Sequence, residues 1–256
     1  MRRGGLGVAY GMLALTLLGA GAIAPPPHPQ ASAARPVPGR ASADVLHDYL
    51  AALLAQRRPK AVSFDYTVSQ LGLHDMEQTH HVYRSGHDER DETVLVDGYT
   101  LKSPSVRILR NRTDRYDVVN VAPRANQYAF HYVGAMRGAG TYTYRFRTLA
   151  RSARAFEAVE IDVDGRTLLP ALIRFHIAGG HARGEGTLRY GLSNMHWVVR
   201  EARVTAKLRD RTTARERIAW SNYHFYEALP QATFDVRKPA APPPKPAPAP
   251  LIPGMR

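Results

Sequence analysis

The stretch TYTYRFR at residues 141–147 places tyrosine or phenylalanine at every second position, with threonine or arginine between them. Strand side chains point alternately to the two faces of a sheet, so this period of two predicts a strand with one buried, aromatic face. The stretch QYAFHYV at 127–133 repeats the pattern a short distance upstream. Together the two stretches predict neighbouring strands that share an aromatic face.

Segments of the same kind recur from Val62 to Tyr226, separated by short connections with the composition of turns. A succession of strands joined by tight turns is a meander, so we expect one large antiparallel sheet. The expected turns include Asp97-Gly98, Asp164-Gly165, Gly179-Gly180 and Asp210-Arg211. The expected strands cover 62–69, 76–84, 92–97, 105–110, 116–121, 127–133, 140–149, 156–163, 171–178, 186–192, 196–209 and 215–226.

A helix is expected ahead of the first strand, from Ala43 to Arg57, with Ser42 as its N-cap and Asp44 in its first turn. Pro59 ends it. Its apolar residues fall on one stripe at helical spacing and need a partner surface, which the sheet supplies. The sequence therefore predicts the α+β class, with a large curved antiparallel sheet, an unclosed β-barrel, packed around an N-terminal helix.

The N-terminal residues are typical of an export signal. Two arginines precede an apolar stretch, and small residues follow at 31–33, which predicts a signal peptide over 1–33 that is cleaved after Ala33. An uncleaved membrane anchor is the alternative. We expect a proline-rich linker over 34–41, a folded domain over 42–236 and a disordered proline-rich tail over 237–256. The chain is then an exported protein of the periplasm, the cell envelope or the extracellular space.

The composition restricts the partners of the chain. It contains no cysteine, which excludes a disulfide framework and a thiolate metal site. Its net charge of +13 favours contact with an anionic membrane or cell-wall surface. The arginines are scattered singly rather than gathered on a basic helix or a known binding module, so nucleic acid is not expected as a partner.

No catalytic motif accompanies the strands: the sequence has no G-x-S-x-G, P-loop or G-x-G-x-x-G. His74, His80, His81 and His87 lie close together in the sequence. Adjacent residues of a strand face opposite ways, so His80 and His81 cannot readily join one metal site, although two or three of the histidines could meet across a hairpin. We expect surface histidines in a polar turn, no metal and no cofactor.

Four carboxylates gather around one expected strand and its turn, namely Glu157, Glu160, Asp162 and Asp164. Paired carboxylates held across a cleft can hydrolyse glycosides, which keeps a hydrolase of envelope polymers as a third hypothesis. Here the acidic residues alternate with valine and isoleucine, so a solvated outer face is the better interpretation. We do not expect an enzyme, and no catalytic residue is assigned.

The aromatic face is the candidate binding site. Tyrosine combines an apolar body with a polar tip, which suits the lining of a partly open cavity, and one helix of about fifteen residues cannot cover so long a sheet. The same side chains could instead simply pack beneath the helix. The expected ligand is a lipid or an acylated molecule, and the expected binding residues are Phe64, Tyr66, Val68, Tyr128, Phe130, Tyr132, Tyr142, Tyr144 and Phe146.

Three stretches run from Val159 to Pro170, from Trp197 to Ala202 and from Arg217 to Tyr223. Their arrangement resembles that of the exported lipoprotein carriers of the LolA and LolB type, and the resemblance in layout spans roughly 42–234. It implies an unclosed antiparallel barrel around helices, with a hydrophobic cavity for acyl chains.

Two functions follow as hypotheses. In the first, the chain is an exported, non-enzymatic protein that binds a lipid or another hydrophobic ligand in the concave face of the half-barrel. In the alternative, it is a structural or interaction module of the cell envelope, with a filled barrel and a basic surface.

Overall fold

The computed structural model describes residues 41–71, 75–110, 116–137, 142–179, 182–208 and 213–236. The expected signal peptide, nearly all of the linker and the tail lie outside these residues. His74 and the expected turns at Gly180 and Asp210-Arg211 lie outside them as well.

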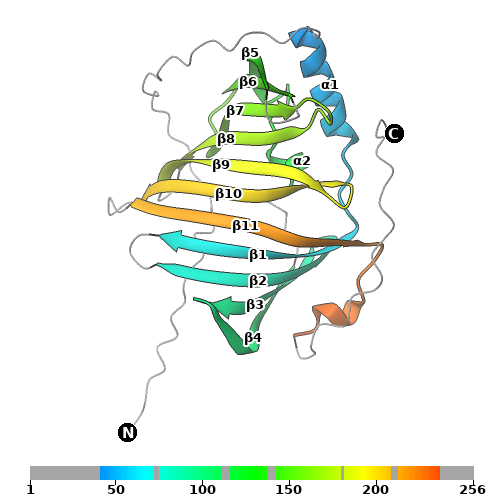
Figure 1. Cartoon of the computed structure of the whole chain (residues 1–256), viewed down its shortest axis with the longest axis vertical. Coiled ribbons are helices and arrows are strands. Elements are labelled where there is room, and N and C mark those ends of the chain that lie inside the picture. The colour runs from blue at the N-terminus through cyan, green and yellow to red at the C-terminus, as the bar shows by residue number, and fades with distance from the viewer. Residues whose placement is uncertain are drawn as a thin grey trace.

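The described chain folds into one antiparallel sheet of eleven strands in the order β4-β3-β2-β1-β11-β10-β9-β8-β7-β6-β5. Two meanders, β1 to β4 and β5 to β11, are joined because the first strand pairs with the last (Figure 1). β4 and β5 form the two edges, so the barrel is not closed. The strands are β1 (Ala61–Leu71), β2 (Met76–Ser85), β3 (Asp88–Val96), β4 (Tyr99–Leu109), β5 (Tyr128–Arg137), β6 (Tyr142–Ala150), β7 (Phe156–Asp164), β8 (Pro170–Gly179), β9 (Ala182–Ser193), β10 (His196–Leu208) and β11 (Thr213–Tyr226).

The expected fold class is confirmed: a curved, unclosed antiparallel sheet packs against an N-terminal helix (Figure 1). Helix α1 (Ser42–Ala55) buries Val45, Tyr49 and Leu53, which follow one another at intervals of four residues. Its N-cap is Ala41, which makes no side-chain capping bond, so the expected cap at Ser42 is wrong by one residue.

The expected strand over 116–121 is wrong. Val118–Val121 forms a short helix, α2, capped by Asp117, whose carboxylate accepts a hydrogen bond of 2.9 Å from the backbone N–H of Val119. Valine favours strands, but this side-chain cap satisfies a helical N–H that a strand would have paired with a neighbour.

Several strands are longer than expected: β3 begins at Asp88 and β4 at Tyr99, β5 runs on to Arg137, and β9 begins at Ala182. The added residues of β3 are charged, and they pair in register with β2 through Tyr83–Arg90 and Arg84–Glu89. Charged residues in a buried strand require partners across the sheet, and a reading of local alternation does not detect such partners.

The main core lies on the inner face of the sheet, where α1 and the segment around α2 pack. The hydroxyl of Tyr49 donates a hydrogen bond of 2.6 Å to the carbonyl of Pro123, which ties α1 to the residues after α2. Tyr49 also meets the ring of Phe130 on β5, at the end of the sheet where α1 lies (Figure 1). The two helical segments therefore fill part of the concave face.

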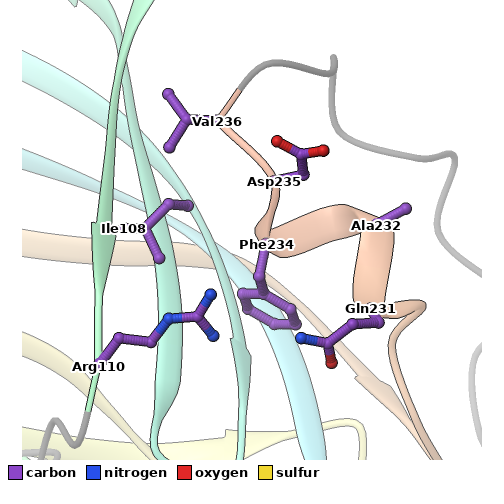
Figure 2. Close-up of a pocket in the computed structure, with 7 residues that line it drawn as sticks. All are labelled: Ile108, Arg110, Gln231, Ala232, Phe234, Asp235 and Val236. Carbon is purple, nitrogen blue, oxygen red and sulfur yellow. The ribbon is translucent and has the colours of Figure 1, made fainter.

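A smaller cluster lies on the outer face beneath the 3-10 helix η1 (Gln231–Phe234). Arg90 is buried there and donates hydrogen bonds to the carbonyls of Thr233 and Asp235, at 3.0 and 2.9 Å. A hollow of about 770 Å³ separates η1 from the end of β4, and Figure 2 shows Arg110, the residue after β4, extending toward Phe234 across it. No described helix is both long and apolar enough to cross a bilayer.

Candidate functional site: the inner face of the sheet

The nine expected binding residues occupy the inner face in two groups. Five strands separate β1, which carries the smaller group, from β6 in the sheet order. The sequence therefore identified two parts of one face rather than one compact site. Phe64, Tyr66 and Val68 lie on β1, whereas Tyr128, Phe130, Tyr132, Tyr142, Tyr144 and Phe146 lie on β5 and β6.

The division of the nine residues by burial differs from their division by strand. Phe64, Val68, Tyr128 and Phe146 are core residues, and the ring of Phe146 is only 1% exposed. The others are more open: Tyr142 is 39% exposed, and the four remaining aromatic residues are half-buried. The expected lining is thus a closed core flanked by aromatic side chains with partly open surfaces.

The β5–β6 group is built around Phe146. Its ring contacts those of Phe130 and Tyr132, with centroids 6.3 and 5.4 Å apart, and both contacts are edge-to-face. Such contacts stabilise the packing beyond the area they bury. Burial, together with the neighbouring Tyr144, raises the pKa of Tyr132, so its hydroxyl stays neutral. The rings of Phe130, Tyr132 and Phe146 therefore form an uncharged aromatic surface.

Several inner-face residues were missed by the sequence analysis. Trp220 of β11 lies beside Tyr66 in the register, and its ring contacts that of Tyr116 at 5.1 Å. Glu216 precedes Trp220 on β11 and accepts a hydrogen bond of 3.2 Å from the side chain of Gln70. Burial raises the pKa of Glu216. The period-two pattern of β11 could have identified Trp220 as an inner-face residue. The residues that Trp220 contacts are set by strand pairing, which the pattern does not show.

A polar cluster lies on the inner face of β1 to β4, at the opposite end of the sheet from β5 and β6. It consists of Tyr66, His80, Asp91 and Arg107, and we call it the Asp91 cluster. The carboxylate of Asp91 is buried and accepts hydrogen bonds from the hydroxyl of Tyr66 and from Arg107, both at 3.0 Å. Nδ1 of His80 lies 2.7 Å from its other oxygen. Burial opposes ionisation of this carboxyl, yet the hydrogen bonds from His80, Tyr66 and Arg107 hold the pKa of Asp91 below its ordinary value.

The histidines are only partly where the sequence placed them. His80 is not in a surface turn: it is buried in β2, because Asp91 on β3 supplies the partner that its ring needs. His81 faces the opposite way, as the alternation predicted, and its ring bonds the carboxylate of Asp65. His87 is exposed in the turn after β2. Within the part of the chain that the structure describes, no three histidine or carboxylate side chains converge in a way that could hold a metal.

The four carboxylates around β7 lie in ion pairs and a turn. Arg145 binds both oxygens of Asp162, at 2.6 and 2.9 Å, and Arg174 binds Glu160 at 2.6 Å. The expected solvated face is wrong for Asp162, which is buried because these guanidinium groups cover it. Asp164 accepts hydrogen bonds from the turn that follows β7, and Glu157 is half-buried on the same strand.

The outer face also carries a group that the sequence did not reveal. Arg189, Arg203 and Arg217, from three adjacent strands, surround the carboxylate of Glu201 at 3.8, 3.0 and 2.6 Å. We call these four residues the Glu201 cluster. Burial opposes ionisation of Glu201, but Arg203 and Arg217 lower its pKa. Three positive charges, each on a side chain that is more than half exposed, thus surround one negative charge.

Comparison with solved structures found chains of similar layout at low identity. A DUF1329 family protein from Desulfovibrio piger shares 12% identity over 76% of this chain and 97% of its own, with a TM-score of 0.43. A LolA superfamily protein from Nitrosomonas europaea shares 12% identity over 75% and 98%, with a TM-score of 0.40. An outer membrane lipoprotein-sorting protein domain from Vibrio parahaemolyticus shares 9% identity over 76% and 96%, with a TM-score of 0.41.

No family model and no curated protein matches the chain. The sequence led us to expect a layout like that of the LolA superfamily, and the solved structures of similar layout include a LolA superfamily protein. At these identities and TM-scores the likeness concerns the layout of the fold alone.

Proposed function

We propose that this chain is an exported, non-enzymatic protein that binds a lipid or another amphiphile against the inner face of its sheet. The observation that carries the proposal is the graded exposure of the aromatic row on β5 and β6. The row runs from the closed core at Phe146 to the open side chain of Tyr142. Binding sites for apolar ligands combine apolar walls with a few polar groups, and tyrosines at the border of a core provide both.

The location of the protein is part of the proposal. The export signal expected over 1–33 supports a protein of the periplasm or the cell envelope, where amphiphiles need a carrier to cross water. All nine expected binding residues remain in the proposal, the four core residues as the floor of the site and the five more open ones as its contact surface.

Replacing Tyr144 tests this proposal. We expect Tyr144→Asp to weaken binding of a fluorescent fatty acid about tenfold or more, because the change removes apolar contact area and places a charge on the inner face. The matched control is Leu149→Asp on the same strand, whose side chain is 69% exposed and points to the outer face. Fluorescence titration measures both variants, and circular dichroism confirms that both are folded. Equal affinities for the two variants would count against the inner face as the site.

A second candidate function is favoured by the Glu201 cluster. Its excess of exposed positive charge supports the interaction module of the cell envelope, docked on an anionic surface. The two functions are compatible, because the cluster lies on the outer face and the aromatic row on the inner face. A carrier can use its outer face for docking while its inner face holds a ligand.

The docking function predicts a specific loss on vesicles. We expect the double variant Arg203→Gln/Arg217→Gln to bind phosphatidylglycerol vesicles about thirtyfold more weakly, at about 1 kcal/mol for each basic side chain near an anionic surface. The control is Lys60→Gln/Arg110→Gln, which removes the same charge from exposed ion pairs elsewhere. Co-sedimentation at low and high salt measures both double variants. If the two lose affinity equally, net charge rather than the Glu201 cluster determines binding.

A further inference from the structure

One polar atom of the Asp91 cluster is held in place by the fold but has no hydrogen-bond partner among the described residues. This atom is Nε2 of His80, which is buried. The residue as a whole is 4% exposed. Most buried polar atoms in folded proteins have partners, and an unsatisfied one costs free energy, so it calls for an explanation.

The other ring nitrogen is fully committed. Asp91 is held as a carboxylate by its three donors, and a carboxylate only accepts hydrogen bonds. Nδ1 of His80, 2.7 Å from it, therefore carries the proton. In the neutral imidazole this leaves Nε2 as a bare acceptor, which needs a donor from outside the cluster.

The ring is also held in orientation. The aromatic rings of His80 and Tyr66 stack with centroids 4.4 Å apart and an interplanar angle of 6°. The hydrogen bonds of Tyr66 and His80 to the same carboxylate fix both rings. The acceptor at Nε2 is thus positioned before any ligand arrives, which lowers the entropic cost of using it.

The surroundings of the cluster are those of an amphiphile site. Tyr66 lies opposite Trp220 in the β1–β11 register, and Trp220 contacts Tyr116. These three rings form a second aromatic row, separate from the one on β5 and β6, and it ends at the Asp91 cluster. On the other side, the side chain of Arg107 is 50% exposed, so solvent reaches the cluster from there. An apolar chain along the row would bring its polar end to the Asp91 cluster.

We propose that Nε2 of His80 accepts a hydrogen bond from a hydroxyl group at the polar end of the bound amphiphile. The inference rests on the proposed function, because it assumes a ligand on the inner face. It narrows the ligand class to amphiphiles that carry an alcohol function, and it places the polar end of the ligand at the inner face of β1 to β4.

The test compares two probes, hexadecanol and hexadecyl methyl ether, in which a methyl group replaces the hydroxyl hydrogen, by displacement of a fluorescent fatty acid. We expect the wild-type protein to prefer the alcohol about tenfold, as one hydrogen bond to a buried acceptor provides. His80→Asn keeps an N–H donor for Asp91 and removes Nε2, so the preference for the alcohol over the ether falls to about one. The control is His81→Asn, on the opposite face of the same strand, which keeps the preference.

Nitrogen NMR of histidine-labelled wild-type protein gives a second measurement that does not depend on a variant that folds. The resonance of Nε2 in His80 should shift on addition of the alcohol and stay in place with the ether. Binding of both probes with equal affinity overturns the inference and leaves the proposed function intact. Displacement by neither probe also overturns the inference, whereas failure of the fluorescent fatty acid itself to bind would count against the proposed function.

Discussion

Phe146→Ala lowers the free energy of unfolding by about 3–5 kcal/mol, the usual cost of truncating a buried phenylalanine. The ring is almost fully buried and is contacted by Phe130 and Tyr132, with Tyr49 of α1 against Phe130. Its loss leaves a cavity between α1 and the β5–β6 end of the sheet, where the described elements cannot readily collapse. Urea denaturation followed by tryptophan fluorescence measures the change.

The control for this prediction is Leu149→Ala, three residues further along β6 on the outer face. Its side chain is exposed, so we expect a change of about 0.5 kcal/mol or less. If Phe146→Ala cost no more than Leu149→Ala, the aromatic row would not be the core that joins α1 to the sheet.

Asp91→Ala has a comparably large effect for a different reason. The variant leaves Tyr66, His80 and Arg107 without the carboxylate that binds all three. Removing one partner of a buried charged network costs about 3–5 kcal/mol, whereas Asp88→Ala, at an exposed ion pair with Arg110, should cost about 1 kcal/mol or less. Urea denaturation at neutral pH measures both.

The effect of Asp91 also depends on pH in a defined direction. Its pKa is lowered in the folded state, so its contribution to stability is complete above the unfolded pKa of about 3.9 and is lost as the pH falls through the folded pKa. The difference between wild type and Asp91→Ala should therefore narrow in denaturation curves recorded at successively lower pH below about 4. A difference that stays constant down to the acid limit would contradict a buried, ionised Asp91.

The sheet could be predicted from the sequence because its signal is local. Each strand of the β5–β11 meander alternates apolar with polar side chains within its own residues, as 141–147 does. The same alternation predicted that Phe146 and Tyr144 share one face. The α1 stripe was equally local, although the helix begins one residue earlier than expected and ends at Ala55 rather than Arg57.

The Asp91 cluster could not be predicted because its signal is not local. His80, Asp91 and Arg107 are polar residues on the inner face of three strands, and only the pairing of β2, β3 and β4 brings them together. Alternation alone assigns such residues to the solvent. The same holds for α2, where the cap at Asp117 and packing onto the sheet outweigh the strand preference of valine.

The most direct test of the central claim is native mass spectrometry of the protein purified gently from its own compartment, followed by organic extraction. The account predicts a stoichiometric amphiphile on the wild-type protein and its loss from Tyr144→Asp. A wild-type protein found only at the mass of its polypeptide would contradict the proposed ligand-binding function and favour the docking module.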